Sequence, residues 1–231
     1  MQPYFFPYLG YFDLINFTDK WVIFDTVQYI RHGWINRNRV LHPKEGWQYI
    51  NVPIKKHSQD TPIKDVIIDN NQNWRERIIG QVQHYKKQAM YFQETAELLM
   101  DCLSTENISI SRLNVLILEK ICYKLDIKFD YRFYSEMDLS LGPVSKPGDW
   151  ALRICEALGA DEYVNPPGGE GIFDKQEFDK RKIKLTIRKL LPFIYICEGY
   201  EYIPNLSILD AFMWNEPQTI KRYLNYHLHE E

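Results

Sequence analysis

The sequence predicts an α/β fold, a partly parallel sheet with flanking helices and a β-hairpin insertion. Strand and helix patterns alternate throughout the second half of the chain, as they do where helices join parallel strands. Residues 33–54 alternate on both sides of a Pro-Lys-Glu-Gly turn, which is typical of a hairpin. Between 73 and 125, apolar residues recur at helical spacing. Since there are no repeats or obvious linkers, we expect one domain over residues 1–231.

Helix and strand signals follow one another along the first half of the chain. Leu9, Phe12 and Ile15 predict a short helix after Pro7, and Asn73 is placed to cap an amphipathic helix. The expected elements are the helix after Pro7, a strand at 21–24, the hairpin with arms beginning at Trp34 and Trp47, a strand at 63–70, and helices at 74–87 and 90–103.

The second half contains clearer start and stop signals. Ser109 or Ser111 is expected to cap a helix that runs to Leu125, and Gly159 should end another. Ser207 is placed as a cap near the end of the chain. The expected elements are strands at 128–134, 162–165, 183–187 and 193–197, a helix at 150–159 opened by Pro147 or Asp149, a loop at 166–171, and two helices within 206–224 that are separated before Pro217.

Charge and cysteine content exclude some classes of function. The 28 Lys and Arg against 31 Asp and Glu give a net charge of −3, so nucleic acid is not expected as a partner. The four widely spaced cysteines are expected to be reduced core thiols, and no metal site is predicted. No apolar stretch reaches the roughly 20 residues of a membrane span, and no signal peptide is evident, so the cytoplasm is the expected location. The histidines without metal-ligand spacing are His32, His42 and His57, with His227 and His229 in a tail expected to fray.

An aromatic and proline-rich stretch, QPYFFPYLGYF, opens the chain. Its prolines lead into a helix start, where free backbone N–H groups favour phosphate or carboxylate. We expect this stretch to form a pocket wall that a ligand approaches closely at a glycine. Its candidate ligand-binding residues are Gln2, Pro3, Tyr8, Gly10 and Tyr11. A rigid N-terminus packed by aromatic rings alone explains the stretch about as well.

Polar side chains crowd a second stretch, DTVQYIRHGWINRNRV. Arginine suits carboxylate or phosphate and tryptophan suits stacking, although a solvated polar face is the usual explanation of such a run. Strand alternation is expected to put Trp34, Asn36 and Asn38 on one face. Arg37 should then point to the other face with Ile35. The candidates here are Asp25 and His32 as catalytic residues and Gln28, Trp34, Asn36 and Arg37 as ligand-binding residues.

A third stretch, YVNPPGGEG, follows a strand pattern, and α/β proteins often bind ligands at such a place. Gly168 and Gly169 are its candidates for ligand binding, and a plain connecting loop is an equal explanation. The stretch is neither a Walker loop nor a GxGxxG motif. Ser207 lacks the GxSxG context of a nucleophile, so a helix cap is its expected role.

In order along the chain, QPYFFPYLGYFDLI, DKWVIFDTVQY, GWINRN, WQYINVP, RICEALGADEYVN and the closing YIPNLSILDAFMWN resemble the WbqC-like family of bacterial proteins. The resemblance covers nearly the whole chain. It implies a place in the assembly of O-antigen or other surface polysaccharides, with transfer of glycine or another aminoacyl group to an amino sugar. Such proteins usually begin with a short strand before Gln-Pro. Here that strand is expected to be missing, shortened or replaced, because Met1 directly precedes Gln2.

The opening order of elements is also similar to nucleotidyltransferase-like, Rossmann-like folds, in which a His-x-Gly-His motif holds ATP phosphates at a helix start. Aligning Gly10 with that glycine puts Tyr8 and Tyr11 at the histidine positions. LSILDAFM then corresponds to the turn that opens a phosphate-contacting helix, which makes Ser207 a further ligand-binding candidate. Tyrosine cannot supply an imidazolium, so the similarity implies the fold and a pocket position without adenylyl transfer.

These observations leave three hypotheses. The first is a transferase that moves an aminoacyl or acyl group to the amine of a nucleotide-linked amino sugar, with phosphate held near residues 8–11. Asp25 or His32 would then be the base, and Asn36 and Arg37 would orient the carbonyl or carboxylate. The second is a non-catalytic protein that binds a sugar nucleotide or glycan precursor, and the third is a nucleotidyltransferase. The residues do not choose between ATP with Mg²⁺ and an activated acyl donor as cosubstrate.

Overall fold

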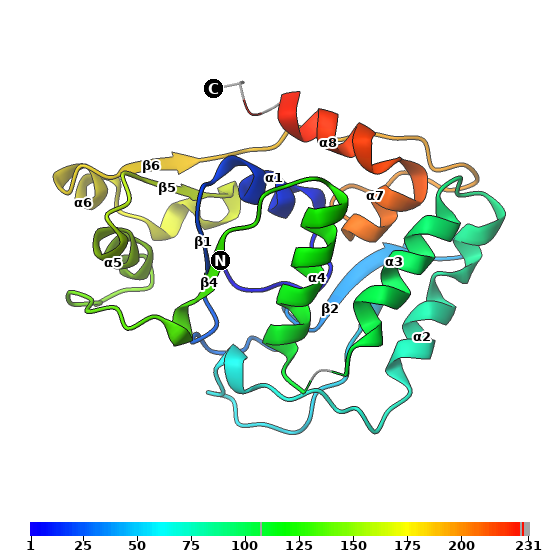
Figure 1. Cartoon of the computed structure of the whole chain (residues 1–231), viewed down its shortest axis with the longest axis horizontal. Coiled ribbons are helices and arrows are strands. Elements are labelled where there is room, and N and C mark those ends of the chain that lie inside the picture. Colours follow the sequence, from blue (N-terminus) through cyan, green and yellow to red (C-terminus); the bar gives the residue numbers. More distant parts are fainter. Residues whose placement is uncertain (107, 227, 229–231) are drawn as a thin grey trace. The chain divides into compact units, whose positions relative to one another are not determined.

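The computed structural model describes residues 1–106, 108–226 and 228, which form two compact units. The first unit comprises Met1–Ser135 with Pro192–Glu231, and the second comprises Glu136–Leu191. Figure 1 shows the helices and strands of both units. The single domain expected over the whole chain stays a prediction. His227 and His229 lie outside the described residues.

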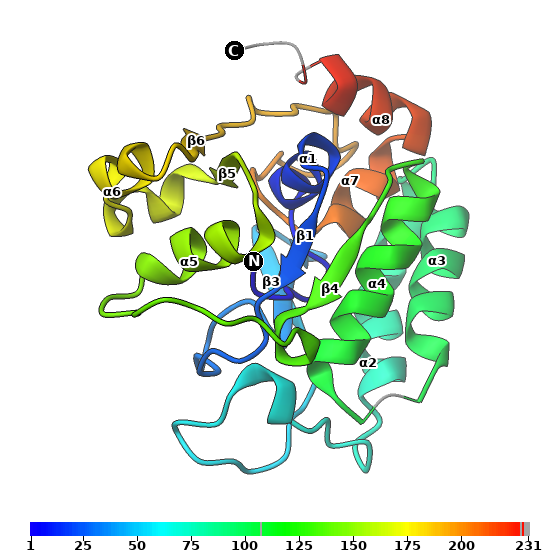
Figure 2. The same ribbon diagram turned by 60° about the vertical axis from the view of Figure 1, so that its left-hand side comes forward.

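A short parallel sheet lies in the first unit. Strand β1 (Trp21–Ile23) pairs in parallel with β4 (Tyr131–Phe133), so that Val22 is opposite Arg132 (Figure 2). Met1 adds to the other edge of β1, because its amino group donates to Val22 O at 2.7 Å and its carbonyl accepts from Phe24 N at 2.8 Å. Met1 therefore makes the two hydrogen bonds of one residue in a parallel strand.

The expected hairpin is confirmed. Strand β2 (Arg37–Leu41) pairs antiparallel with β3 (Trp47–Asn51), and Arg39 is opposite Tyr49. Gly46 has a φ of +68° in the turn, a conformation that glycine adopts without the cost of a side chain. The Pro-Lys-Glu-Gly sequence therefore joins the two arms of a hairpin, as expected.

Helices pack around α4 in the first unit. Leu113, Ile117 and Ile121 of α4 are buried at helical spacing, and both views show α3 beside α4 (Figures 1 and 2). The Ser109 cap is confirmed, since its hydroxyl accepts from Arg112 N at 3.5 Å. The helical elements are α1 (Leu9–Phe17), η1 (Ile63–Asp65), α2 (Trp74–Gln81), η2 (Gln83–Lys87), α3 (Phe92–Ser104), α4 (Ile110–Lys124), α7 (Ile208–Trp214) and α8 (Pro217–Tyr226), with the short turn η3 (Tyr134–Glu136) after β4.

Three element predictions for this unit need correction. The strand expected at 63–70 is a 3₁₀ turn followed by isolated bridges, because Ile63 and Val66 are buried at a spacing of three residues. The helix expected at 74–87 ends at Gln81 and tightens into η2. The strand expected at 193–197 has no ladder partner among the described residues. Its backbone carbonyls accept from Tyr200 N and Tyr202 OH instead, and the Tyr195 hydroxyl donates to Asp210.

The second unit has its own core. Strand β5 (Glu162–Asn165) pairs in parallel with β6 (Lys184–Ile187). Between and before them lie α5 (Asp149–Leu158), η4 (Pro167–Ile172) and α6 (Lys175–Lys180). Gly159 ends α5 with a φ of +62°, as predicted. The core side chains are Leu152, Cys155, Phe178 and Ile183. The parallel pairs in both units, each flanked by helices in sequence, confirm a mixed α/β protein.

The described cysteines are all free and buried, as expected for core thiols. Burial raises the pKa of Cys102 and of Cys122 to about 12, which makes both poor nucleophiles at neutral pH. Among the described helices, none combines the length and apolar character that crossing a membrane requires.

Candidate functional site

Buried polar side chains fix the loop that opens the chain. The Asn38 side chain donates from Nδ2 to Phe5 O at 3.0 Å and to Phe6 O at 2.8 Å. Asn114 donates to Pro3 O at 2.8 Å, and Ser207 Oγ donates to Phe6 O at 2.9 Å. These donors come from β2, α4 and the start of α7, so three distant segments pair the loop's backbone carbonyls.

The helix start after this loop is closely packed. A Cβ on Gly10 would collide with the Tyr8 ring, so in this structure the glycine makes room for an aromatic side chain. Tyr11 is buried and its hydroxyl donates to Gln2 O at 2.7 Å. The packing alone therefore accounts for Gly10. A role in ligand binding for residues 2–11 stays a prediction.

Ser207 caps α7, as expected. Its Oγ accepts from Leu209 N at 3.3 Å while donating to the opening loop. The Ser207 hydroxyl therefore both donates and accepts a hydrogen bond within the protein.

Asp25 joins the carboxyl ends of the two parallel strands. Only 2% of the residue is exposed. Its two carboxylate oxygens accept from Ser135 N at 3.0 Å and from Ser135 Oγ at 2.6 Å. The carboxyl ends of parallel strands are where α/β folds commonly bind ligands. Burial and the two bonds to Ser135 enclose the carboxylate, and a catalytic role of Asp25 stays a prediction.

Gln28 and Asn36 also make structural contacts. The exposed Gln28 donates to Gln59 O at 2.9 Å. Asn36 Oδ1 accepts from Tyr29 OH at 2.7 Å, and its Nδ2 donates to Val52 O at 2.9 Å. The Asn36 amide thus ties the turn before β2 to the residue after β3.

The outer face of the hairpin brings together cationic and aromatic side chains. The Arg37 guanidinium lies 4.1 Å from the centroid of the Tyr49 ring. The Arg39 guanidinium lies 5.3 Å from the Trp34 ring and 5.1 Å from the Trp47 ring. We call this surface the arginine–aromatic face, made of His32, Trp34, Arg37, Arg39, Trp47 and Tyr49. At these distances a guanidinium is attracted to the face of an aromatic ring.

Strand register explains the arginine–aromatic face. Arg37 and Arg39 share one side of β2, and residues opposite them on β3 project to the same side. Asn38 and Val40 face inward and are buried. The expected grouping of Trp34 with Asn38, away from Arg37, is wrong. Alternation begins only where β2 begins, so the turn before it places Trp34 with the arginines.

The arginines of this face have no acidic partner. Among residues 1–106, 108–226 and 228, neither Arg37 nor Arg39 forms an ion pair, and the Nε atom of each is buried without a hydrogen-bond partner. Arg37 donates to the carbonyl of His32, and Arg39 donates to Asn205 O at 3.4 Å. Two positive charges two residues apart therefore stand uncompensated beside exposed rings, which is an arrangement that attracts anions.

His32 belongs to this face. Its Nδ1 lies 3.4 Å from an Arg37 guanidinium nitrogen, and its backbone has a φ of +64°. Of the two catalytic candidates, His32 is thus the exposed one and Asp25 the enclosed one.

Sequence reasoning missed Arg39, Trp47 and Tyr49 as parts of the site. The available signal was the Arg-x-Arg spacing in one hairpin arm and Trp-x-Tyr in the other. Their contact depends on which residue of β2 is opposite which residue of β3, and the length of the turn sets that register.

A second polar cluster surrounds Asp210, which is buried. Its carboxylate accepts from Tyr85 OH at 2.5 Å and from Tyr195 OH at 2.6 Å, while Tyr85 OH accepts from Leu41 N at 2.8 Å. Burial raises the pKa of Asp210 from 3.8 to about 6, against the lowering effect of the two tyrosine hydrogen bonds. The cluster links α7, η2, β2 and the segment around Tyr195.

Gly168 and Gly169 lie in η4 of the second unit. A Cβ on Gly169 would come within 2.5 Å of Asn165 Nδ2, whereas nothing lies within 4 Å of the equivalent position on Gly168. Asn165 Nδ2 also donates to Pro166 O at 2.8 Å. Close packing against Asn165, at the end of β5, therefore accounts for Gly169. A ligand role for either glycine stays a prediction.

The fold and the hairpin surface together define a mixed α/β protein with an uncompensated cationic, aromatic face. The chain belongs to the WbqC-like protein family, whose model matches residues 2–222. It is 29% identical over 231 residues to "Uncharacterized protein Rv1507c" of Mycobacterium tuberculosis (strain ATCC 25618 / H37Rv), covering 98% of this chain and 96% of that protein. No solved structure matches the chain significantly.

Proposed function

We propose that the protein binds a nucleotide-linked amino sugar on the arginine–aromatic face and transfers an aminoacyl or acyl group to its amine, in the assembly of an O-antigen type surface polysaccharide. One observation carries the proposal: Arg37 and Arg39 lie against three aromatic rings without forming an ion pair among the described residues. The WbqC-like membership and the aminoacyl transfer that the family resemblance implies support the polysaccharide context.

The chemistry of the ligand follows from these side chains. Guanidinium groups bind diphosphate through paired N–H donors. Trp34 and Trp47 are 37% and 40% exposed, so part of each ring stays available to stack on a sugar or a base. A nucleotide sugar offers both features in one molecule, whereas a neutral glycan would leave the two charges uncompensated.

In the transfer step, the sugar amine attacks the carbonyl carbon of an activated acyl donor. The new C–N bond forms while the bond to the leaving group breaks, and the amine loses its extra proton. His32 is the base that the geometry favours, because it is exposed beside Arg37. Asp25 is disfavoured, because its carboxylate is buried and bonded to Ser135 through both oxygens.

A second candidate function is non-catalytic binding of the same sugar nucleotide on behalf of a neighbouring enzyme. The observation that favours it is the enclosed state of Asp25, which leaves the face with one exposed base candidate. A nucleotidyltransferase-like core with retained ATP chemistry is the third candidate, and it alone requires ATP with Mg²⁺.

A thermal-shift panel tests these candidates. The panel contains Mg-ATP, glycine, coenzyme A, and UDP-linked amino sugars beside their hydroxyl counterparts. A ligand at about 100 times its Kd stabilises the fold by roughly 2.7 kcal/mol, which is readily seen. We expect a shift with the amino sugar nucleotides, followed by an acylated product in mass spectrometry when a donor is added. A shift without any product supports the binding protein, and a shift with Mg-ATP alone supports nucleotidyl transfer. No shift with any sugar nucleotide contradicts the proposal.

A further inference from the structure

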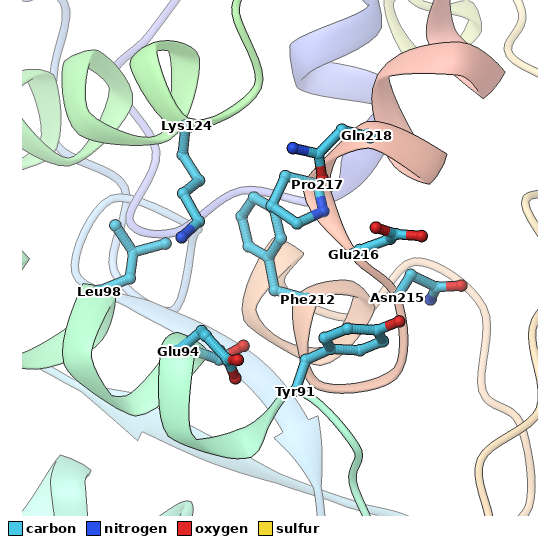
Figure 3. A pocket seen from close by; sticks show the side chains of 10 residues that line it. Tyr91, Glu94, Leu98, Lys124, Phe212, Asn215, Glu216, Pro217 and Gln218 are labelled. Carbon is cyan, nitrogen blue, oxygen red and sulfur yellow. The ribbon is translucent and has the colours of Figure 1, made fainter.

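A separate hollow of about 300 Å³ lies at the corner between α7 and α8 (Figure 3). Side chains from α3, the last residue of α4, and the turn from α7 into α8 form its walls. The lining residues are Tyr91, Glu94, Thr95, Leu98, Lys124, Phe212, Asn215, Glu216, Pro217 and Gln218.

The hollow exists because α7 cannot continue into α8. Asn215 ends α7 in an extended conformation and Pro217 starts α8, so the chain turns sharply between them. Tyr91 N donates to Met213 O at 3.1 Å and holds the start of α3 beside the end of α7. The two ends are thereby kept close while the turn leaves space next to Phe212.

The charges around this hollow have both signs. Lys124 contributes one positive charge, and Glu94 and Glu216 contribute two negative charges. All three side chains are exposed, and none forms an ion pair or a side-chain hydrogen bond within the part of the chain that the structure describes. In Figure 3, Lys124 and Glu216 stand on opposite sides of the Phe212 ring, with Glu94 below.

The apolar part of the wall lies between these charges. The half-buried Leu98, Tyr91 and Pro217 provide a surface suited to a short aliphatic chain, above the buried Phe212 ring. A volume of about 300 Å³ is at the small end for ligand pockets, which fits an amino acid better than a nucleotide sugar.

We propose that this hollow binds an aliphatic diamino acid of the lysine or ornithine type. Its carboxylate would pair with Lys124, its two ammonium groups with Glu94 and Glu216, and its methylene chain would lie along Leu98 and Pro217. The net charge of +1 on such a ligand balances the net −1 of the three side chains. This inference does not rest on the proposed function, because it concerns other residues and another ligand.

Calorimetric titration of the whole chain with four probes tests the inference: L-lysine, L-ornithine, cadaverine and 6-aminohexanoate. We expect L-lysine or L-ornithine to bind with a Kd below about 1 mM. Cadaverine lacks the carboxylate and 6-aminohexanoate lacks the α-amine, so each should bind at least about fivefold more weakly.

Variants locate the binding. Lys124→Met should remove the preference for L-lysine over cadaverine. Glu216→Gln should weaken the binding of both L-lysine and cadaverine. Lys128→Met, which removes an exposed lysine outside the hollow, should change neither. The inference is overturned if neither diamino acid binds, or if binding is unchanged in Lys124→Met and Glu216→Gln. Sugar nucleotide binding, measured on the same samples, should be unaffected by all three substitutions, so that the two proposals fail separately.

Discussion

The hydroxyl of Tyr85 donates to the buried carboxylate of Asp210 over 2.5 Å, although 125 positions separate the two residues in the sequence. The same hydroxyl accepts from Leu41 N in β2, and Tyr195 donates to the second carboxylate oxygen. Asp210 therefore holds together the start of α7, the turn η2 and one arm of the hairpin that carries the arginine–aromatic face.

The raised pKa of Asp210 predicts a pH dependence of stability. Because the folded protein binds this proton more tightly than the unfolded chain, the contribution is fully present below pH 3.8. It is lost as pH rises through the folded value of about 6. The wild-type free energy of unfolding should contain a component that falls by up to about 3 kcal/mol between these pH values.

Urea unfolding of the wild type and of Asp210→Asn at intervals from pH 4 to pH 8 measures this component. The difference between the two proteins removes the effect of other titrating groups. We expect that difference to change mainly between pH 4 and pH 6 and to level off above pH 7. A difference that is constant with pH would mean that Asp210 titrates normally.

Asn114 gives a prediction for the opening loop. Its Nδ2 donates to Pro3 O at 2.8 Å and to Ile35 O at 2.7 Å inside the core. Asn114→Leu leaves two buried carbonyls without a donor, at a cost of about 2 to 5 kcal/mol in unfolding free energy. Asn71→Leu, at an exposed position, is the control and should cost less than about 0.5 kcal/mol. Equal effects of the two substitutions in urea unfolding would refute a role of Asn114 in fixing the loop.

The contact between Gly10 and Tyr8 predicts that Gly10→Ala changes the free energy of unfolding in opposite directions with and without the Tyr8 ring. Gly10→Ala places a methyl group against the Tyr8 ring and should destabilise the protein. With Tyr8→Ala the space is free, and the same change should stabilise by up to about 1 kcal/mol, because alanine favours a helix over glycine. Thermal unfolding of the four proteins measures both effects. A destabilisation of equal size in both backgrounds would show that something other than the Tyr8 ring requires the glycine.

Elements with strong local signals could be predicted from the sequence. The turn residues around Gly46 specify the hairpin, Ser109 and Ser207 cap the helices they begin, and Gly159 ends one. The strand expected at 63–70 was wrong because its buried residues pack through a 3₁₀ turn, which a run of β-branched residues does not reveal.

The candidate site could be predicted only in part, since its contacts cross the chain. The chemistry of His32, Trp34 and Arg37 marks them as candidates in the sequence, and the structure puts His32 beside Arg37 and Trp34 beside Arg39. Their aromatic partners on β3 depend on register, and the Ser135 partner of Asp25 lies 110 positions away. No local pattern indicates such pairings. The sequence around Asp25 therefore does not show whether its carboxylate is enclosed or accessible.

The exposed tryptophans give a spectroscopic prediction. A ligand that stacks on Trp34 or Trp47 should quench part of the intrinsic fluorescence, whereas the buried Trp74 should not respond. In Trp34→Phe/Trp47→Phe the quenching by a UDP-linked amino sugar should disappear. Because both residues are partly exposed, the double variant should remain within about 1 kcal/mol of wild-type stability. Quenching that persists in the double variant would place the ligand elsewhere.

Isothermal titration of a UDP-linked amino sugar into the wild type and into Arg37→Gln/Arg39→Gln tests the central claim most directly. Arg132→Gln, an exposed arginine on β4, serves as the control. The account predicts binding that weakens with added salt, a Kd at least about tenfold higher in the double variant, and no change in the control. A wild-type Kd retained in Arg37→Gln/Arg39→Gln would contradict the claim that the arginine–aromatic face is the ligand site.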